Sequence, residues 1–201
     1  MLKDDTYKTI EFPSEGIFKD KGSKFISYAF PVSEEDTIKE IIHRIKKEHY
    51  SARHHCYAYR LGYSGENYRV NDDGEPSGTA GRPIHGQLLS NELSNILVVV
   101  VRYFGGTLLG VSGLINAYKC ATIDVISNSE IVTKIIYKKF RLQFDYQIQN
   151  SVMRIVKDEQ LEIIKSDYQM FCSLEILIRL QKEESVSEKF KKIEGLKIEE
   201  I

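Results

Sequence analysis

Three short stretches of the sequence carry side chains that could perform chemistry or hold a ligand. The first is the pair His54-His55, the second is NDDGEPSGTAGRPI at residues 71–84, and the third is RYFGGTLLGVSG at residues 102–113. Together they supply imidazoles, carboxylates, hydroxyls, an arginine, a tyrosine and a glycine-rich backbone. The candidate site residues are His54, His55, Asp72, Asp73, Glu75, Ser77, Thr79, Arg102, Tyr103, Gly105 and Gly106.

Two catalytic arrangements can be drawn from these residues. Ser77 as nucleophile, with His54 or His55 as base and Asp73 as the orienting acid, would form a triad, but no GxSxG elbow is present. The acids and histidines could instead bind a divalent metal, but their spacing matches neither an EF-hand nor an HExxH motif. Adjacent histidines on a strand point to opposite faces, so only one easily joins a given site. We therefore assign no catalytic residue, metal ligand or cofactor, and favour a binding protein while leaving an enzyme open.

A glycine-rich turn, Gly105-Gly106, follows the most apolar stretch of the chain. A turn between a strand and a helix can hold a phosphate with its backbone N–H groups. The pattern GGxxxGxxG is neither GxGxxG nor a P-loop, and no lysine lies near enough to meet a terminal phosphate. The simpler interpretation is a tight turn. An enzyme or binder of a small anionic ligand at this turn is the alternative function.

The segment 71–84 has the composition of a loop, with an Asp-Gly turn dipeptide and a glutamate held extended by the following proline. Arg102 ends a run of valines, and a charge placed there must reach water or an acid. We expect Arg102 either to pair with the acids of this loop or to contact an anion or a partner. The hydroxyl and N–H groups of the loop suit an ordered surface that recognises a partner.

The composition is that of an ordinary globular protein with 42% hydrophobic and 28% charged residues among 201. Because 28 basic side chains oppose 29 acidic ones, the chain is not a basic body that binds duplex nucleic acid by charge alone. Three separated cysteines without a CxxC motif fit a reducing cytoplasm. We expect no membrane association, because no apolar run reaches the ~20 residues of a membrane span.

The first part of the chain predicts strands at residues 7–12, 21–32 and 54–62, a strand beginning at residue 96, and helices at residues 34–49 and 107–128. Four consecutive valines without alternation indicate a strand covered on both faces. In the second predicted helix, small residues recur along one face and allow close packing on the sheet. They are Gly110, Gly113, Ala117 and Ala121.

A short polar connection at residues 127–133 separates this part from a second unit. There the pattern predicts a strand at 134–146, a helix at 147–160, strands at 161–168 and 170–180, a helix at 183–195 and a strand at 196–201. The order β-α-β-β-α-β is that of a ferredoxin-like sandwich. We therefore predict an α+β protein with domains at residues 1–130 and 133–201.

RNA-recognition modules share this topology and need aromatic side chains on the open face of the sheet. Alternation puts Tyr137 and Phe171 on that face, where they could stack on bases. Glu175 and Glu199 share the face and oppose a basic platform, and no RNP motif is present. Either RNA binding or a salt-bridged face remains open. The outward residues are Tyr137, Lys139, Arg141, Gln143, Phe171, Ser173, Glu175, Leu177 and Arg179.

Four segments resemble the IMPACT family: KGSKFISYAFPV, HHCYAYRLG, DDGEPSGTAGRPI and VVVRYFGGTLLGVSGLINAY. They look like the IMPACT N-terminal domain, and the two-unit arrangement resembles the bacterial YigZ-type members. The resemblance implies a first domain with the fold of the second domain of ribosomal protein S5. It also implies a second domain similar to the ferredoxin-like domains of elongation factor G.

Both comparisons point towards translation, and the eukaryotic relatives restrain a kinase that phosphorylates a translation initiation factor. The resemblance therefore implies a cytoplasmic binding protein whose partner is RNA, the ribosome or a translation-related protein. No oligomeric state is predicted. We expect the binding surface to comprise His54, Asp73, Glu75, Ser77, Thr79, Arg102 and Tyr103.

Overall fold

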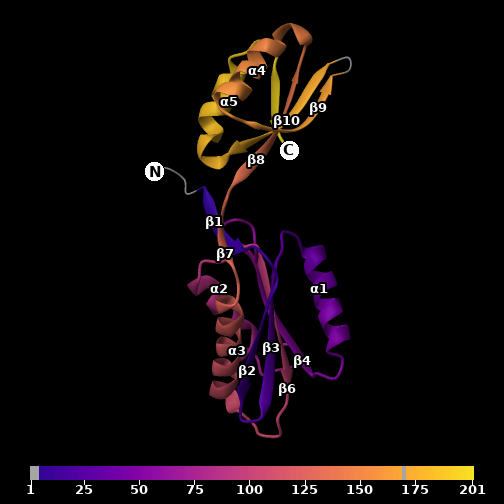
Figure 1. The fold of residues 1–201 in the computed structure, drawn as a ribbon, viewed down its shortest axis with the longest axis vertical. Helices are drawn as coiled ribbons and strands as arrows, with labels where there is room; N and C mark the ends of the chain where they lie inside the picture. The colour runs from indigo at the N-terminus through magenta and orange to yellow at the C-terminus, as the bar shows by residue number, and fades with distance from the viewer. Residues whose placement is uncertain (1–4, 169–170) are drawn as a thin grey trace. The chain divides into compact units, whose positions relative to one another are not determined.

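The computed structural model describes residues 5–168 and 171–201, which form two compact units (Figure 1). One unit spans residues 7–134, and the other comprises residues 5–6 and 135–201. Residues 1–4 of the predicted first domain lie outside the described residues. Both units combine sheet and helix, so the chain has a mixed α/β, two-domain fold.

The first unit is built on a five-stranded sheet of order β2-β3-β6-β4-β5, in which every neighbouring pair is antiparallel. Its strands are β2 (Ser14–Asp20), β3 (Ser23–Pro31), β4 (His54–Leu61), β5 (Asn67–Asn71) and β6 (Ile96–Tyr103). A two-stranded sheet pairs β1 (Thr6–Ile10) with β7 (Ile131–Ile135). The helices are α1 (Glu35–Glu48), α2 (Gly81–Ser90) and α3 (Gly110–Ser127).

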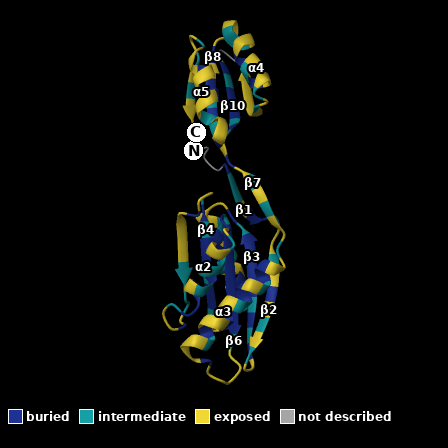
Figure 2. Ribbon diagram, turned by 90° about the vertical axis from the view of Figure 1, so that its left-hand side faces the viewer, coloured by how far each residue is buried: buried dark blue, intermediate teal, exposed yellow. Residues whose placement is uncertain are grey.

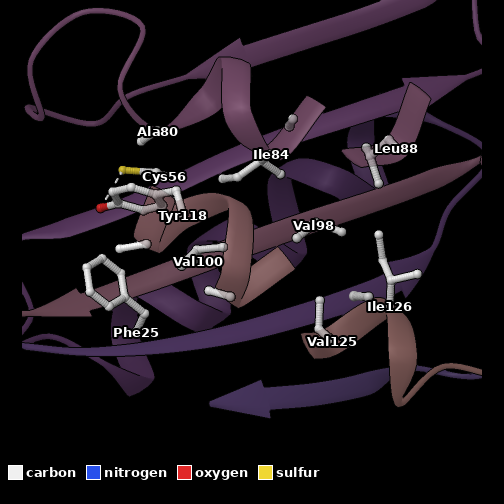
Figure 3. Close-up of a cluster of buried hydrophobic side chains, with 14 of the residues drawn as sticks. Phe25, Cys56, Ala80, Ile84, Leu88, Val98, Val100, Tyr118, Val125 and Ile126 are labelled. Atoms are coloured by element: carbon white, nitrogen blue, oxygen red, sulfur yellow. Dashed lines mark hydrogen bonds between the residues drawn. The ribbon is translucent and has the colours of Figure 1, made fainter. Parts of the chain in front are cut away.

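Helices cover both faces of the five-stranded sheet, as the run of valines predicted. On one face, Val98 and Val100 of β6 pack against α2 and α3, in the cluster that Figure 3 shows. On the other face, Val99 and Val101 pack against α1. The outer side of α3 is exposed, whereas β6 is buried (Figure 2). This antiparallel sheet is thus covered by helices on both faces, an arrangement that is more typical of parallel sheets.

Strands β2 and β5 and helix α2 of the first unit were not predicted. Strand β2 has few large apolar residues, and one of them, Ile17, is exposed, so its sequence lacks a clear alternation. Helix α2 begins inside the segment that we predicted to be a loop through residue 84. Pro83 lies in the first turn of this helix. Because the N–H groups of a first turn have no partner within the helix, the lack of an N–H at proline costs no helix hydrogen bond. The predicted loop is thus a loop only as far as residue 80.

The second unit has a four-stranded sheet of order β11-β8-β10-β9. Its elements are β8 (Tyr137–Phe144), α4 (Gln149–Asp158), β9 (Glu162–Tyr168), β10 (Cys172–Arg179), α5 (Glu183–Lys191) and β11 (Lys197–Glu200). Short 3-10 turns, η1 (Tyr146–Ile148) and η2 (Leu180–Lys182), precede the two helices. The predicted order β-α-β-β-α-β is confirmed. Residue 170, included in one predicted strand, lies outside the described residues.

The connection between the two units differs from the prediction. Helix α3 runs to Ser127, and β7 then begins at Ile131, where we expected a polar linker. The predicted strand at 134–146 is in fact the end of β7 followed by β8, with a break at Ile136. The apolar residues on both sides of this break belong to different sheets, which a linear pattern does not reveal. Within the described residues, none of the helices is long and apolar enough to span a membrane.

Candidate functional site

Asp72 fixes the loop of residues 72–80 to the start of α2. Its Oδ1 accepts hydrogen bonds from the backbone N–H groups of Ala80, at 3.0 Å, and Gly81, at 2.8 Å, and its Oδ2 accepts one from Gly78 at 2.8 Å. A carboxylate is favoured at a helix N-terminus because the first N–H groups there lack partners. Burial by itself raises the pKa of Asp72, but these N–H groups and Arg82 hold it below its ordinary value. The loop is therefore an anchored structure.

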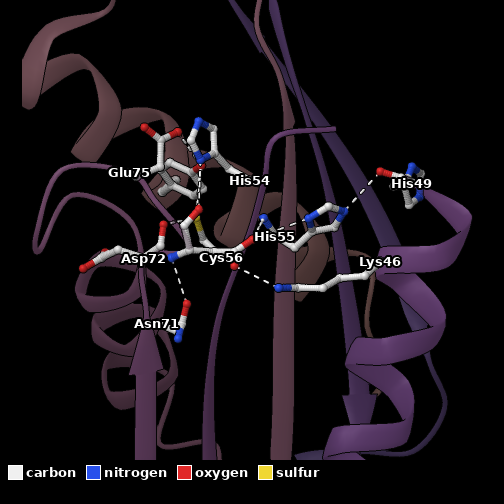
Figure 4. A network of polar contacts seen from close by, with 10 residues as sticks. Lys46, His49, His54, His55, Cys56, Asn71, Asp72 and Glu75 are labelled. Atoms are coloured by element: carbon white, nitrogen blue, oxygen red, sulfur yellow. Dashed lines mark hydrogen bonds and ion pairs between the residues drawn. The ribbon is translucent and has the colours of Figure 1, made fainter. Parts of the chain in front are cut away.

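Asp73 ties the same loop to β4 through His55 and to α1 through Lys46, two residues labelled in Figure 4. Its Oδ2 accepts a hydrogen bond from the backbone N–H of His55 at 2.7 Å, and its Oδ1 accepts one from Lys46 at 2.9 Å. Its carbonyl accepts one from Nδ1 of His54 at 2.9 Å. Burial raises the pKa of Asp73, but Lys46 and His55 outweigh burial and lower it. The side chain is thus committed to positioning the loop.

Glu75 and Arg102 form a buried salt bridge, one of the two arrangements that we expected for Arg102. Oε1 of Glu75 accepts hydrogen bonds from Nη1 of Arg102 and from the hydroxyl of Tyr118, both at 2.8 Å. The thiol of Cys56 donates to the same hydroxyl at 3.3 Å. Sequence reasoning missed Tyr118, although a tyrosine among small residues of a packed helix needs a polar partner.

The two histidines point to opposite faces of the sheet, as predicted. His54 lies on the α2 and α3 side with Glu75, whereas His55 and Tyr103 lie on the α1 side (Figure 4). Nε2 of His55 donates to the carbonyl of His49 at 3.2 Å, and Nδ1 of His49 lies 2.8 Å from the hydroxyl of Tyr103. Burial lowers the pKa of His55. His55 and Tyr103 therefore do not share one surface with Arg102.

Ser77 and Thr79, the two residues of the loop with hydroxyl groups, differ in their exposure to solvent. Thr79 is buried, and its hydroxyl donates to the carbonyl of Pro76 at 2.6 Å. Ser77 is exposed, and within the described residues it makes no hydrogen bond to His54 or His55. A serine nucleophile needs its base within hydrogen-bond reach. The arrangement thus supplies loop structure and does not assemble the triad considered from sequence.

The glycine-rich turn is held by close contact with the turn between β2 and β3. The N–H of Gly105 donates to Oγ of Ser23 at 3.2 Å. A Cβ atom at Gly105 would lie 1.9 Å from the carbonyl carbon of Gly22. Gly106 has a φ of +88° and open space beside it. Gly105 is therefore needed for packing, and its N–H is already engaged within the protein.

A cavity of about 430 Å³ opens beside the buried salt bridge. Its polar lining consists of Arg53, His54, Glu75 and Arg102. The apolar lining comes from the loop before α2, the turn after β6 and the first turns of α3, and consists of Pro76, Phe104, Leu108, Leu109, Val111 and Leu114. A largely apolar cavity with a few polar groups is typical of binding sites.

The acids and histidines do not converge on a shared point. Within residues 5–168 and 171–201, no three His, Cys, Asp or Glu side chains are grouped as ligands of a metal ion would be. Asp72 faces backbone N–H groups, Asp73 faces Lys46 and a strand, and Glu75 faces Arg102. Each of these acids is therefore engaged with groups of the protein itself.

The open sheet face of the second unit is salt-bridged. Glu175 accepts from Lys139 at 2.6 Å and from Arg141 at 3.1 Å, and Arg141 also contacts Glu199 at 3.1 Å. The exposed aromatic residue Tyr137 pairs with Arg179 at one end of the β8–β10 ladder. Phe171 precedes the opposite end, eight residues before Arg179 and so roughly 26 Å away at ~3.3 Å per residue. The two rings are thus too far apart to stack on adjacent bases.

Known proteins resemble the chain over most of its length. The family model of the Impact N-terminal domain matches residues 21–126, a range that includes every candidate site residue. IMPACT family member YvyE of Bacillus subtilis is 31% identical over 91% of this chain and 84% of its own length. IMPACT family member YigZ of Escherichia coli is 33% identical over 79% of this chain and 78% of its own. A crystal structure described only as a hypothetical protein superposes with a TM-score of 0.74 at 29% identity and covers 98% of both chains. With the family model and full-length relatives in agreement, this chain belongs to the IMPACT family.

Proposed function

We propose that the protein is a cytoplasmic binding protein linked to translation or its regulation, and that it acts by binding a protein partner, either free or as part of the ribosome. The link to translation comes from the family resemblance, since eukaryotic members restrain a kinase that phosphorylates a translation initiation factor. The preference for binding over catalysis comes from the site, where the polar side chains hold the loop and a salt bridge. The surface that remains available to a partner is largely apolar.

The observation that carries this proposal is the exposed apolar rim of the cavity. Phe104, Leu108 and Val111 are 53%, 83% and 60% exposed and lie around one opening. Clustered exposed apolar side chains mark interaction sites in soluble proteins. Together with Arg53 and His54, these three residues define what we call the docking face.

RNA is the second candidate partner, supported by two exposed aromatic residues on the sheet of the second unit, Tyr137 and Phe171. Against it, the cations of that sheet face are already paired with Glu175 and Glu199. A near-neutral surface binds nucleic acid weakly and with a shallow dependence on salt. The docking face is therefore the stronger basis for a function.

We also propose a finer fold assignment. The sheet order β11-β8-β10-β9, with α4 and α5 packed in one core with β8 and β10, supports a ferredoxin-like domain similar to those of elongation factor G. The match of the family model to residues 21–126 supports an IMPACT N-terminal domain at residues 1–130, with the fold of the second domain of ribosomal protein S5. The ferredoxin-like domain is then residues 133–201.

A capture experiment tests the proposed function. The wild-type protein, a Leu108→Ser/Val111→Ser double variant and an Ile123→Ser control are immobilised, and bound ribosomal proteins and translation factors are quantified by mass spectrometry. Ile123 is an exposed apolar residue of α3, about 18 Å further along the helix axis than Val111. We expect the wild type and the control to retain the same translation protein and the double variant to lose it.

Two results would count against this function. Recovery of identical proteins from all three columns would exclude the docking face. Enrichment of no ribosomal protein or translation factor over an empty matrix would exclude the link to translation. Loss of the captured protein after nuclease treatment, without any effect of the double substitution, would favour RNA as the partner.

A further inference from the structure

Arg102 is a buried arginine with unused hydrogen-bond donors. It is only 6% exposed, and Nη1, which donates to Glu75, makes the single side-chain hydrogen bond that Arg102 has within the described residues. Its Nε is buried and has no acceptor there. A guanidinium carries five N–H donors, and a buried donor without an acceptor is costly. Such an arrangement in the wall of a cavity indicates a site for an acceptor group.

The geometry of the guanidinium limits what that acceptor can be. The rings of Phe25 and Phe104 each lie 5.6 Å from Cζ of Arg102, where they pack over the planar group. Glu75 occupies Nη1 and Nε is enclosed by protein atoms, so Nη2 is the donor that a ligand in the cavity can reach. An N–H of a guanidinium donates most strongly to a charged oxygen, as in a carboxylate or phosphate.

The charges around the cavity favour a single negative charge. Arg53, His54 and Arg102 line it on the basic side, and Glu75 is the acid that lines it. The oxygen of Glu75 lies 2.8 Å from the guanidinium and would repel a second anion bound there. That repulsion is larger for a doubly charged phosphate than for a carboxylate. A carboxylate is therefore the better fit.

The walls of the cavity favour an apolar body attached to that carboxylate. They are formed by leucine, valine and phenylalanine side chains, and the volume of about 430 Å³ accommodates a large side chain. Leu108 and Val111 also extend the apolar surface beyond the opening, because both are mostly exposed. A surface that continues outside the cavity suits a peptide chain better than a free small molecule.

We propose that this cavity binds an acidic side chain of a protein partner that stands next to a large apolar residue. The carboxylate accepts a charge-assisted hydrogen bond from Nη2 of Arg102, and the neighbouring apolar side chain packs against Leu108 and Val111. The inference rests on the proposed function, since it names the chemistry of the partner that the docking face recognises.

The probe is a synthetic peptide with blocked ends whose centre is leucine–glutamate–phenylalanine, compared with the same peptide carrying glutamine. Binding to the full chain is followed by NMR and calorimetry. We expect the glutamate peptide to bind with a Kd below about 1 mM and the glutamine peptide to bind at least roughly tenfold more weakly. The amide signals of Phe104 and Val111 should shift with the glutamate peptide.

Variants separate recognition from folding. Arg102→Lys keeps the charge but removes the Nη2 donor, so we expect roughly tenfold weaker binding, with folding checked by thermal unfolding. Leu108→Ser changes a side chain that is 83% exposed, so it should leave the fold intact and weaken binding several-fold. Ile123→Ser should bind as the wild type does.

The outcomes distinguish this inference from the proposed function. Equal affinity for the glutamate and glutamine peptides overturns the inference, as does absence of binding. If inorganic phosphate or hexanoate binds as tightly as the peptide, the inference of a partner side chain is wrong, and the cavity is a site for anions in general or for small carboxylates. If the peptide fails while capture of a translation protein still depends on Leu108 and Val111, the inference falls and the proposed function stands.

Discussion

Replacing Asp72 is the most direct test of how this loop is held. In the wild type, one carboxylate accepts hydrogen bonds from the backbone N–H groups of Gly78, Ala80 and Gly81. Asp72→Ala removes all three acceptor contacts and leaves the first turn of α2 without its negative charge. Asp72→Asn keeps one acceptor oxygen but places an amide against a donor. The order of stability should therefore be wild type, Asn variant, Ala variant.

The magnitude follows from the number and kind of contacts. Loss of a helix-capping side chain costs about 0.5–2 kcal/mol, and a hydrogen bond to a charged group contributes about 1.5–3 kcal/mol. The three contacts share one half-buried carboxylate and are not additive, so we expect a loss of about 2–3 kcal/mol for the Ala variant. For a unit the size of residues 7–134, this corresponds to a fall of roughly 6–15 °C in Tm.

Differential scanning calorimetry is the appropriate assay, because it can resolve separate transitions for the two units. Only the transition of the unit that contains Asp72 should move. Glu40→Gln, which neutralises an exposed acid on α1, is the matched control and should change Tm by about 1 °C or less. If the Ala variant melts with the control, the carboxylate contributes no net stability and our account of the loop is wrong.

The same residue predicts a dependence on pH. The folded-state pKa of Asp72 is depressed, so its contribution is present above the unfolded value, about 3.9, and is lost as the pH falls through the folded value. Below about pH 4 the wild type should therefore lose Tm more steeply than Asp72→Asn. If the curves of Tm against pH are parallel for the two proteins, the carboxyl of Asp72 does not cause the loss of stability at low pH.

Three other measurements test the packing around the site. Gly105→Ala places a Cβ 1.9 Å from the backbone of Gly22 and should destabilise the unit by about 1–3 kcal/mol in urea unfolding; an unchanged midpoint would contradict the close approach. Tyr118→Phe leaves Glu75 with one donor fewer and should cost about 1–3 kcal/mol, whereas a neutral result would mean that water replaces the hydroxyl. Iodoacetamide should modify Cys120 first in the native protein, because burial raises the pKa of the other two thiols; mass spectrometry identifies the modified residue.

Much of the fold follows from local patterns. The valine run of β6 predicted a strand covered on both faces, and the alternation in β8 and β10 predicted which side chains face outwards. Helix α2 was not predicted, because its glycines and proline resemble a loop when taken without their surroundings. It forms because Asp72 satisfies its first N–H groups and because Ile84 and Leu88 are buried against the sheet.

The sequence by itself determined the family and the two-unit order of elements, because motifs and periodicity are properties of neighbouring residues. Only the tertiary structure decided what the candidate site residues do. It put Arg102 with Glu75 and Tyr118 on one face of the sheet and Tyr103 on the other. It also turned the hydroxyl of Thr79 inwards and placed an apolar cavity beside the arginine. These arrangements depend on contacts between segments far apart in the chain, and spacing along the sequence does not specify them.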